Sequence, residues 1–167
     1  MKTLTQLHED FKISYKTITK ECFVYKLNNR GKIKIFNGNW SEINDFVNNV
    51  YFSNGEPIPV SKTNGWTIKE YDAGTYIIYI KHIDSIHDCY GIFFSCKHLI
   101  SVPKINTHNI TSMSFMFKGC ENLENVPLFD TNALEYMTSM FSDCPKLNSE
   151  TKRVWSQIYD FNKHIKK

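Results

Sequence analysis

A repeat of 24 residues constrains the fold of this 167-residue chain more than any other feature of its sequence. Cysteines recur at Cys96, Cys120 and Cys144, and the same 24-residue step relates phenylalanines, leucines and methionines around them. The residues in this register are Phe93, Phe117, Phe141, Leu99, Leu123, Leu147, Met113 and Met137. Periods of about 20 to 50 residues are typical of stacked units that bury their apolar sides against one another. We therefore expect these residues to form a structural spine.

Within one unit the apolar residues lie three positions apart, as in Phe117, Cys120, Leu123 and Val126. This spacing fits neither the alternation of a strand nor the sustained period of a helix. It suits a chain that bends around a core through short strands and tight helical turns. The pattern predicts an α+β fold class, in which a short leucine-rich-repeat-like solenoid of about three 24-residue coils forms the larger part.

The motif "FxxCxxLxxVP", followed by "MxxMFxxC", resembles the BspA-like leucine-rich repeats in their MFxxCxxL variant. The resemblance covers about residues 78–148. Many members of that family are bacterial surface proteins that bind host or matrix partners. The resemblance therefore implies a protein-binding repeat.

The remaining segments predict units that flank the repeat. Residues 1–54 are expected to form a small basic α+β unit, with a hairpin over 21–36 and a short helix within 39–52, and the turn-rich residues 55–65 a connector. Residues 66–148 are expected to hold a capping hairpin and the repeat array. Residues 149–167 predict a C-terminal capping helix, because an array needs polar-faced ends.

No spacing in the sequence indicates an active site, a cofactor or a metal. Glycine-rich phosphate loops, nucleophile elbows and paired metal-binding histidines are all absent from the sequence. The stretch "HIDSIHDC" at 82–89 is the one cluster of His, Asp and Cys, and a solvated edge is the simpler interpretation. Single cysteines a full unit apart favour buried packing over disulfide or zinc chemistry. We predict a protein that is not an enzyme.

Basic residues gather in the N-terminal part, where Lys12, Lys16 and Lys20 precede a candidate basic face. That face consists of Lys26, Arg30, Lys32 and Lys34. Three interpretations remain open: an edge strand that lysine protects from aggregation, a surface for nucleic acid, or one for an acidic protein or ribonucleoprotein.

A second candidate surface lies where the repeats differ by gaining apolar residues. These candidate partner-binding residues are Phe94, Phe115, Leu128 and Tyr136. Aromatic residues outside a core are favoured anchors of interfaces. The alternative is that they pack against the N-terminal unit or the C-terminal helix.

The N-terminus lacks the apolar segment of a secretory signal, and no apolar run is long enough to span a membrane, so we expect a cytoplasmic protein without membrane contact. The leading hypothesis is a non-catalytic binder or stoichiometric inhibitor of another protein or ribonucleoprotein complex. One version is a phage-encoded, anti-CRISPR-like inhibitor of bacterial defence. The alternatives are a nucleic-acid-binding protein that uses the basic strand, and a BspA-like adhesion or recognition fragment.

Overall fold

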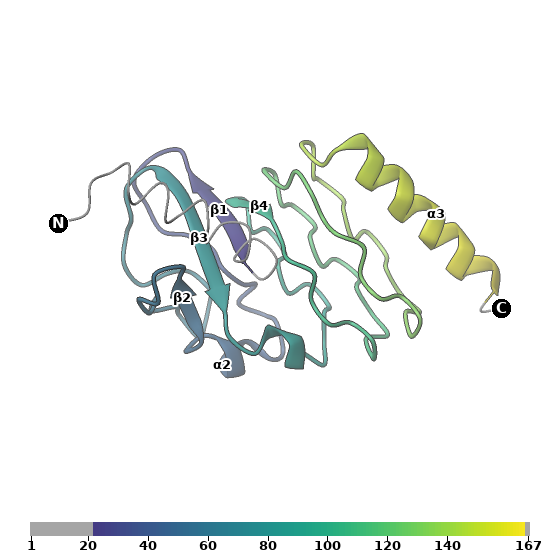
Figure 1. Cartoon of the computed structure of the whole chain (residues 1–167), viewed down its shortest axis with the longest axis horizontal. Coiled ribbons are helices and arrows are strands. Elements are labelled where there is room, and N and C mark those ends of the chain that lie inside the picture. Colours follow the sequence, from purple (N-terminus) through teal and green to yellow (C-terminus); the bar gives the residue numbers. More distant parts are fainter. Residues whose placement is uncertain (1–21, 166–167) are drawn as a thin grey trace.

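The computed structural model describes residues 22–165, and the basic residues Lys12, Lys16 and Lys20 lie outside that range. Its helical elements are α2 (Ile43–Phe46), a 3-10 turn (Ile83–Ser85) and α3 (Ser149–Ile165). Its strands are β1 (Phe23–Leu27), β2 (Val50–Phe52), β3 (Gly74–Ile80) and β4 (Leu99–Ser101). The sheet and α3 lie at opposite ends of the molecule (Figure 1).

The four strands form one antiparallel sheet in the order β2-β3-β1-β4. Strand β1 lies inside this sheet, where Phe23 pairs with Ile78 of β3 and Tyr25 pairs with Leu99 of β4. Phe23 and Tyr25 are fully buried, whereas Lys26 is exposed. This alternation places one face of β1 in the core, as the pleat of a strand requires. The sheet joins strands from both sides of the expected connector at 55–65.

The predicted fold class, a leucine-rich-repeat-like solenoid closed by a capping helix, is wrong. The regular structure is one antiparallel four-stranded sheet, with α3 as the long helix. Within residues 22–165 the repeats contribute β4, turns and two isolated parallel bridges, Ser101 with Asn125 and Ser112 with Tyr136. The reason is that an apolar period predicts which side chains are buried, but does not specify backbone pairing.

The expected N-terminal hairpin-plus-helix unit is also corrected. The backbone of 31–35 aligns with 65–71 instead of with β1, since Gly31 bridges Tyr71 and the Ile33 N–H donates to Thr67 Oγ1 at 3.0 Å. Helix α2 has only four residues and no side-chain N-cap bond. Ser41, two residues before α2, donates its hydroxyl to Asp88 at 2.7 Å. Tertiary contacts therefore take the groups that local structure would have used.

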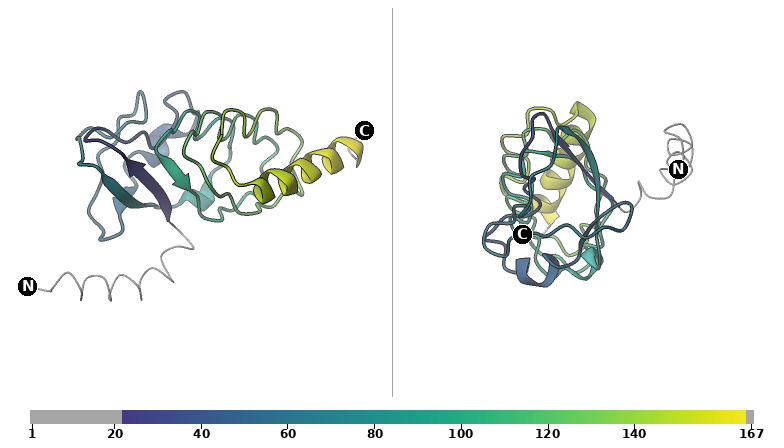
Figure 2. Two further views of the ribbon diagram at one scale, coloured as in Figure 1. Left: turned by 90° about the horizontal axis from the view of Figure 1, so that it is seen from above. Right: turned by 90° about the vertical axis from the view of Figure 1, so that its left-hand side faces the viewer.

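Residues one repeat apart lie side by side in the segment before α3 (Figure 2). Backbone N–H groups donate to carbonyls 23 positions later, as from Phe93 to Met116 and from Phe117 to Met140, both at 3.0 Å. The ring of Phe117 stacks between those of Phe93 and Phe141, with centroids 5.6 and 5.7 Å away. These contacts join the repeats to one core cluster that extends from β1 to α3.

Helix α3 begins with a side-chain cap, because Asn148 Oδ1 accepts a hydrogen bond from the Thr151 N–H at 2.6 Å. Trp155 is 2% exposed and packs on Phe129 and Phe141 at centroid distances of 5.7 and 5.8 Å. The first turns of α3 are thereby fixed against the last repeat.

Gly65 is the position at which the fold tolerates a side chain least. Its φ is +72°, and an added Cβ would lie 2.1 Å from the Phe36 carbonyl oxygen. We expect Gly65→Ala to lower the free energy of unfolding by about 3 kcal/mol or more, through backbone strain and overpacking together. Urea unfolding measures this loss.

The matched control is Gly55→Ala, because Gly55 also has a positive φ of +86° but has no atom within 4 Å of an added Cβ. Its expected cost is strain alone, about 1 to 2 kcal/mol. Equal losses in the two variants would contradict the close approach at Gly65.

Candidate partner-binding site

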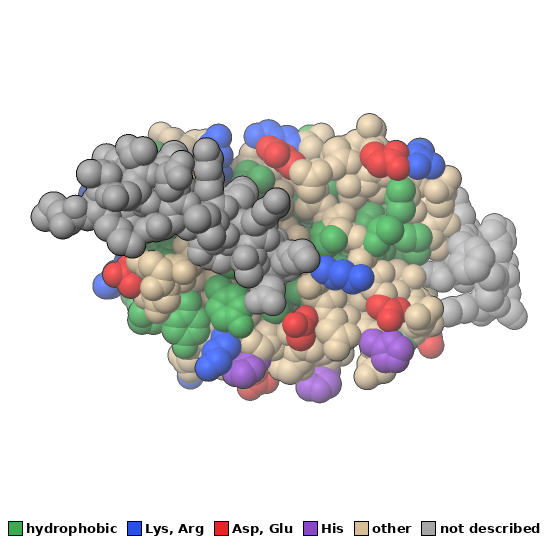
Figure 3. Space-filling view, in the orientation of Figure 1, with side chains coloured by type: hydrophobic (Ala, Val, Ile, Leu, Met, Phe, Trp, Pro, Cys, Tyr) green, Lys and Arg blue, Asp and Glu red, His purple; other side chains and the backbone are tan. Residues whose placement is uncertain are grey.

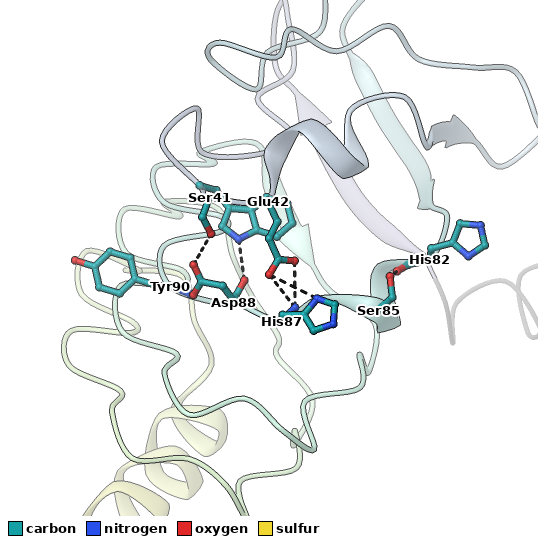
Figure 4. A network of polar contacts seen from close by, with 8 residues as sticks. Ser41, Glu42, His82, Ser85, His87, Asp88 and Tyr90 are labelled. Atoms are coloured by element: carbon teal, nitrogen blue, oxygen red, sulfur yellow. Dashed lines mark hydrogen bonds and ion pairs between the residues drawn. The ribbon is translucent and has the colours of Figure 1, made fainter.

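A polar network attaches residues 86–90 to the segment around α2 (Figure 4). The Trp40 indole N–H donates to the Asp88 carbonyl at 2.7 Å, and the Ser41 hydroxyl donates to Asp88 Oδ2 at 2.7 Å. The His87 N–H donates to both carboxylate oxygens of Glu42, at 2.9 and 3.1 Å. These bonds fix the backbone that leads into Tyr90.

Tyr90 is one of the residues that line a recess with aromatic walls. Its backbone N–H donates to Asp88 Oδ1 at 2.8 Å, and its side chain is 53% exposed. Its ring meets that of Phe115 edge to face, with centroids 5.5 Å apart. The recess has a volume of about 330 Å³ and is lined by Asn37, Asn39, Tyr90, Gly91, Phe94 and Phe115, which we call the aromatic recess.

Phe115 has a backbone conformation that is rare for an aromatic residue. Its φ is +59°, in the left-handed region, where a β-carbon costs about 1 to 2 kcal/mol. The equivalent positions one repeat away are Gly91 and Ser139, also with positive φ. The Lys118 ammonium lies 5.7 Å from the centre of the Phe115 ring. The chain thus has a large apolar ring where its neighbouring repeats have small residues.

The structure brings together two of the four predicted partner-binding residues. Phe94 and Phe115 are half-buried and line the aromatic recess. Leu128 and Tyr136 are 54% and 60% exposed but do not line it. Sequence reasoning missed Tyr90, although the same comparison of repeats indicates it, since Ser114 and Thr138 stand at the equivalent positions.

The face of the molecule in Figure 3 carries no large area of one charge. Exposed apolar side chains lie in separate groups, with acidic and basic side chains interspersed between them. Of the predicted basic face, Lys26, Arg30 and Lys32 are exposed and Lys34 is half-buried. Arg30 lies 3.6 Å from the Glu70 carboxylate, which partly offsets its charge.

The cysteines of the predicted spine are buried, and Cys89, Cys96, Cys120 and Cys144 are not in disulfides. Cys120 and Cys144 each donate a thiol hydrogen bond of 3.1 Å to the carbonyl of the phenylalanine of the preceding repeat, Phe93 and Phe117. Burial raises the pKa of the Cys89 and Cys120 thiols well above the ordinary value, and that of Cys96 to about 12. Such thiols stay protonated at neutral pH and are poor nucleophiles.

Side chains of the cluster at 82–89 make hydrogen bonds that stabilise the fold. Glu42 and Asp88 accept the bonds of the network described above, and Ser85 donates its hydroxyl to the His82 carbonyl at 2.8 Å. Within residues 22–158 there is no group of three His, Cys, Asp or Glu side chains that could hold a metal ion. No helix among these residues has the length and apolar character needed to cross a lipid bilayer.

The chain is thus a small protein that combines a four-stranded antiparallel sheet, a 24-residue repeat and the aromatic recess. A family model described as "Mycoplasma protein of unknown function, DUF285" matches residues 81–167, which is more than half of the chain, and the chain belongs to this family. A search of curated proteins and a search of solved structures each gave no match.

The raised thiol pKa values predict how stability depends on pH. Unfolded thiols ionise near their ordinary pKa of about 8.5, whereas the buried ones remain protonated. The contribution of the thiols is therefore complete below that pH and is lost as the pH rises toward the folded pKa. The expected decline in unfolding free energy is up to about 1.4 kcal/mol per pH unit for each buried thiol.

Urea unfolding between about pH 7 and about pH 10 measures this slope. Cys120→Ala removes one of the buried thiols and should reduce the slope relative to the wild type. Identical slopes, or rapid thiol alkylation of the folded protein, would show that burial does not control these groups.

Proposed function

We propose that this protein is a non-catalytic protein-binding module that holds its partner at the aromatic recess. The observation that carries the proposal is Phe115, an aromatic residue held at a positive φ with its ring in a surface recess. Backbone strain of this kind clusters at functional sites, where the surrounding structure maintains it. Packing alone would be served by glycine or serine, as the equivalent positions in the other repeats demonstrate.

The recess has the composition of an interface centre. Tyr90 and Phe115 offer apolar ring area, while Asn37 and Asn39 at the lining offer amide groups for hydrogen bonds. Aromatic anchors in a desolvated pocket contribute most of the binding free energy of many interfaces. A partner that inserts a large apolar side chain here would bury both rings. A partner complex whose surface is covered by this contact would be inhibited by one bound copy of this protein per complex.

The 24-residue repeat supports a finer assignment of family. We propose that the 24-residue repeat belongs to the BspA-like group in its MFxxCxxL variant, because its cysteine, phenylalanine and leucine recur in that register. An adhesion or recognition fragment is the corresponding alternative. Fractionation of cells that produce the protein tests it, since an adhesin requires surface exposure.

A second candidate function is binding to nucleic acid through Lys26, Arg30 and Lys32, whose side chains are exposed. Phosphate contacts make affinity fall steeply with salt concentration. A mobility-shift assay with RNA and single-stranded DNA at low salt tests this candidate. If this candidate function is correct, a complex forms, and the double substitution of Lys26→Glu with Lys32→Glu weakens it.

The experiment for the aromatic recess compares two substitutions of Phe115. Phe115→Gly removes the ring and relieves the strain, so its unfolding free energy should stay within about 1 kcal/mol of the wild type. Phe115→Ala removes the ring and keeps the strain, so it should be less stable than the glycine variant by about 1 kcal/mol. Both should weaken partner binding by about tenfold or more.

The partner is recovered from bacterial cells with the tagged protein, with and without nuclease, and its affinity for each variant is then measured. Ile68→Ala is the matched control, because Ile68 is 59% exposed and does not line the recess. A partner bound equally by Phe115→Gly and the wild type would overturn the proposal. A loss confined to Tyr136→Ala would place the interface at Tyr136 instead.

A further inference from the structure

A row of backbone donors ends without acceptors at the last repeat. The Met113, Phe115 and Phe117 N–H groups donate to the carbonyls of Tyr136, Thr138 and Met140, at 2.8, 3.0 and 3.0 Å. One repeat later the equivalent donors belong to Met137, Ser139 and Phe141. Within residues 22–158 these three N–H groups have no hydrogen-bond acceptor. Backbone N–H groups left without acceptors in this way are available to the carbonyl oxygens of another chain.

This row of donors forms one wall of a groove. The groove has a volume of about 310 Å³ and lies between residues 137–141 and the side chains of Lys152, Trp155 and Ser156 on α3. We call it the edge groove. Met140 and Trp155 are each 2% exposed, so much of the lining is apolar and fixed in the core. The buried indole N–H of Trp155 also has no hydrogen-bond partner within the described part of the chain.

We propose that the edge groove binds a peptide segment of a partner protein whose backbone follows the turns of residues 136–140. Carbonyls of that segment accept hydrogen bonds from Met137, Ser139 and Phe141, as the carbonyls of Tyr136, Thr138 and Met140 accept them from Met113, Phe115 and Phe117. Addition of a peptide to an exposed backbone edge supplies affinity through main-chain bonds and specificity through side-chain pockets. The site is separate from the aromatic recess.

A second copy of this chain does not fit as the occupant. Head-to-tail stacking would require the first row of repeat carbonyls to be available, at the end nearest the sheet. In that row the Ile92 carbonyl already accepts the Asn37 N–H at 2.8 Å, and the Asp88 carbonyl accepts the Trp40 indole N–H at 2.7 Å. Carbonyls at the end nearest the sheet are therefore already bonded, whereas the N–H groups at the last repeat are not. This difference favours a peptide from a different protein as the occupant.

The lining also defines the chemistry of the peptide. Met137, Met140 and Phe141 favour an apolar side chain, while the Lys152 ammonium favours a carboxylate close to it. The expected segment combines apolar with acidic residues.

A displayed library of random linear peptides provides the probe. Selection on the full chain should enrich peptides of this composition, and Ser156→Trp should weaken their binding by about tenfold or more because the indole fills the groove. Gln157→Trp is the control, since Gln157 is the next exposed residue of α3 and does not line the groove. It should leave the affinity unchanged.

Amide hydrogen exchange of the wild type provides a measurement that depends on no substitution. Peptide binding should slow exchange at Ser139 and Phe141, whose amides are the proposed donors. Unchanged exchange at both residues, equal binding by Ser156→Trp in a folded state, or failure to enrich any peptide would each overturn the proposal.

Discussion

The surface of this protein depends on backbone hydrogen bonds that join residues 23 positions apart, from Phe93 to Met116 and onward through the repeats. The bonds fix the distance between successive turns, so that the phenylalanine rings stack at 5.6 and 5.7 Å. They also orient carbonyls toward buried thiols, as for Cys120 and Phe93. Because buried backbone groups must be paired, this ladder sets the conformation of every turn along it. The positive φ of Phe115 and the open donors of Met137 and Ser139 both follow from it.

The two ends of the ladder differ. At one end the sheet supplies acceptors and donors, and the segment around α2 is attached through Trp40, Ser41 and Glu42. That attachment closes the first row and forms one wall of the aromatic recess. At the other end α3 covers the rings of Phe129 and Phe141 through Trp155, but leaves the backbone edge beside them open. The proposed binding sites lie at these two unlike junctions.

The sequence predicted which residues of the repeat are buried, but it did not predict how the strands pair. The 24-residue period indicated residues such as Phe117 and Leu123, which the structure buries completely. It did not predict that β1 pairs with β3 and β4, because those strands lie far from it in sequence and their pairing carries no local signal. The comparison of repeats indicated Phe94 and Phe115 as surface aromatics, and applied to position 90 it would have added Tyr90. Their convergence with Asn37 and Asn39 depends on the network at Asp88, which no spacing predicts.

The sequence by itself determined the repeat period and the residues that recur in it. These properties are local or periodic. Apolar burial depends on them directly, because it is a strong and non-directional driving force. Only the tertiary structure decided the order of the sheet, the strained backbone of Phe115 and the open edge at 137–141. Each of these depends on which distant partner a backbone group finds. That choice rests on directional hydrogen bonds, whose net contribution of about 1 kcal/mol each leaves little trace in the sequence.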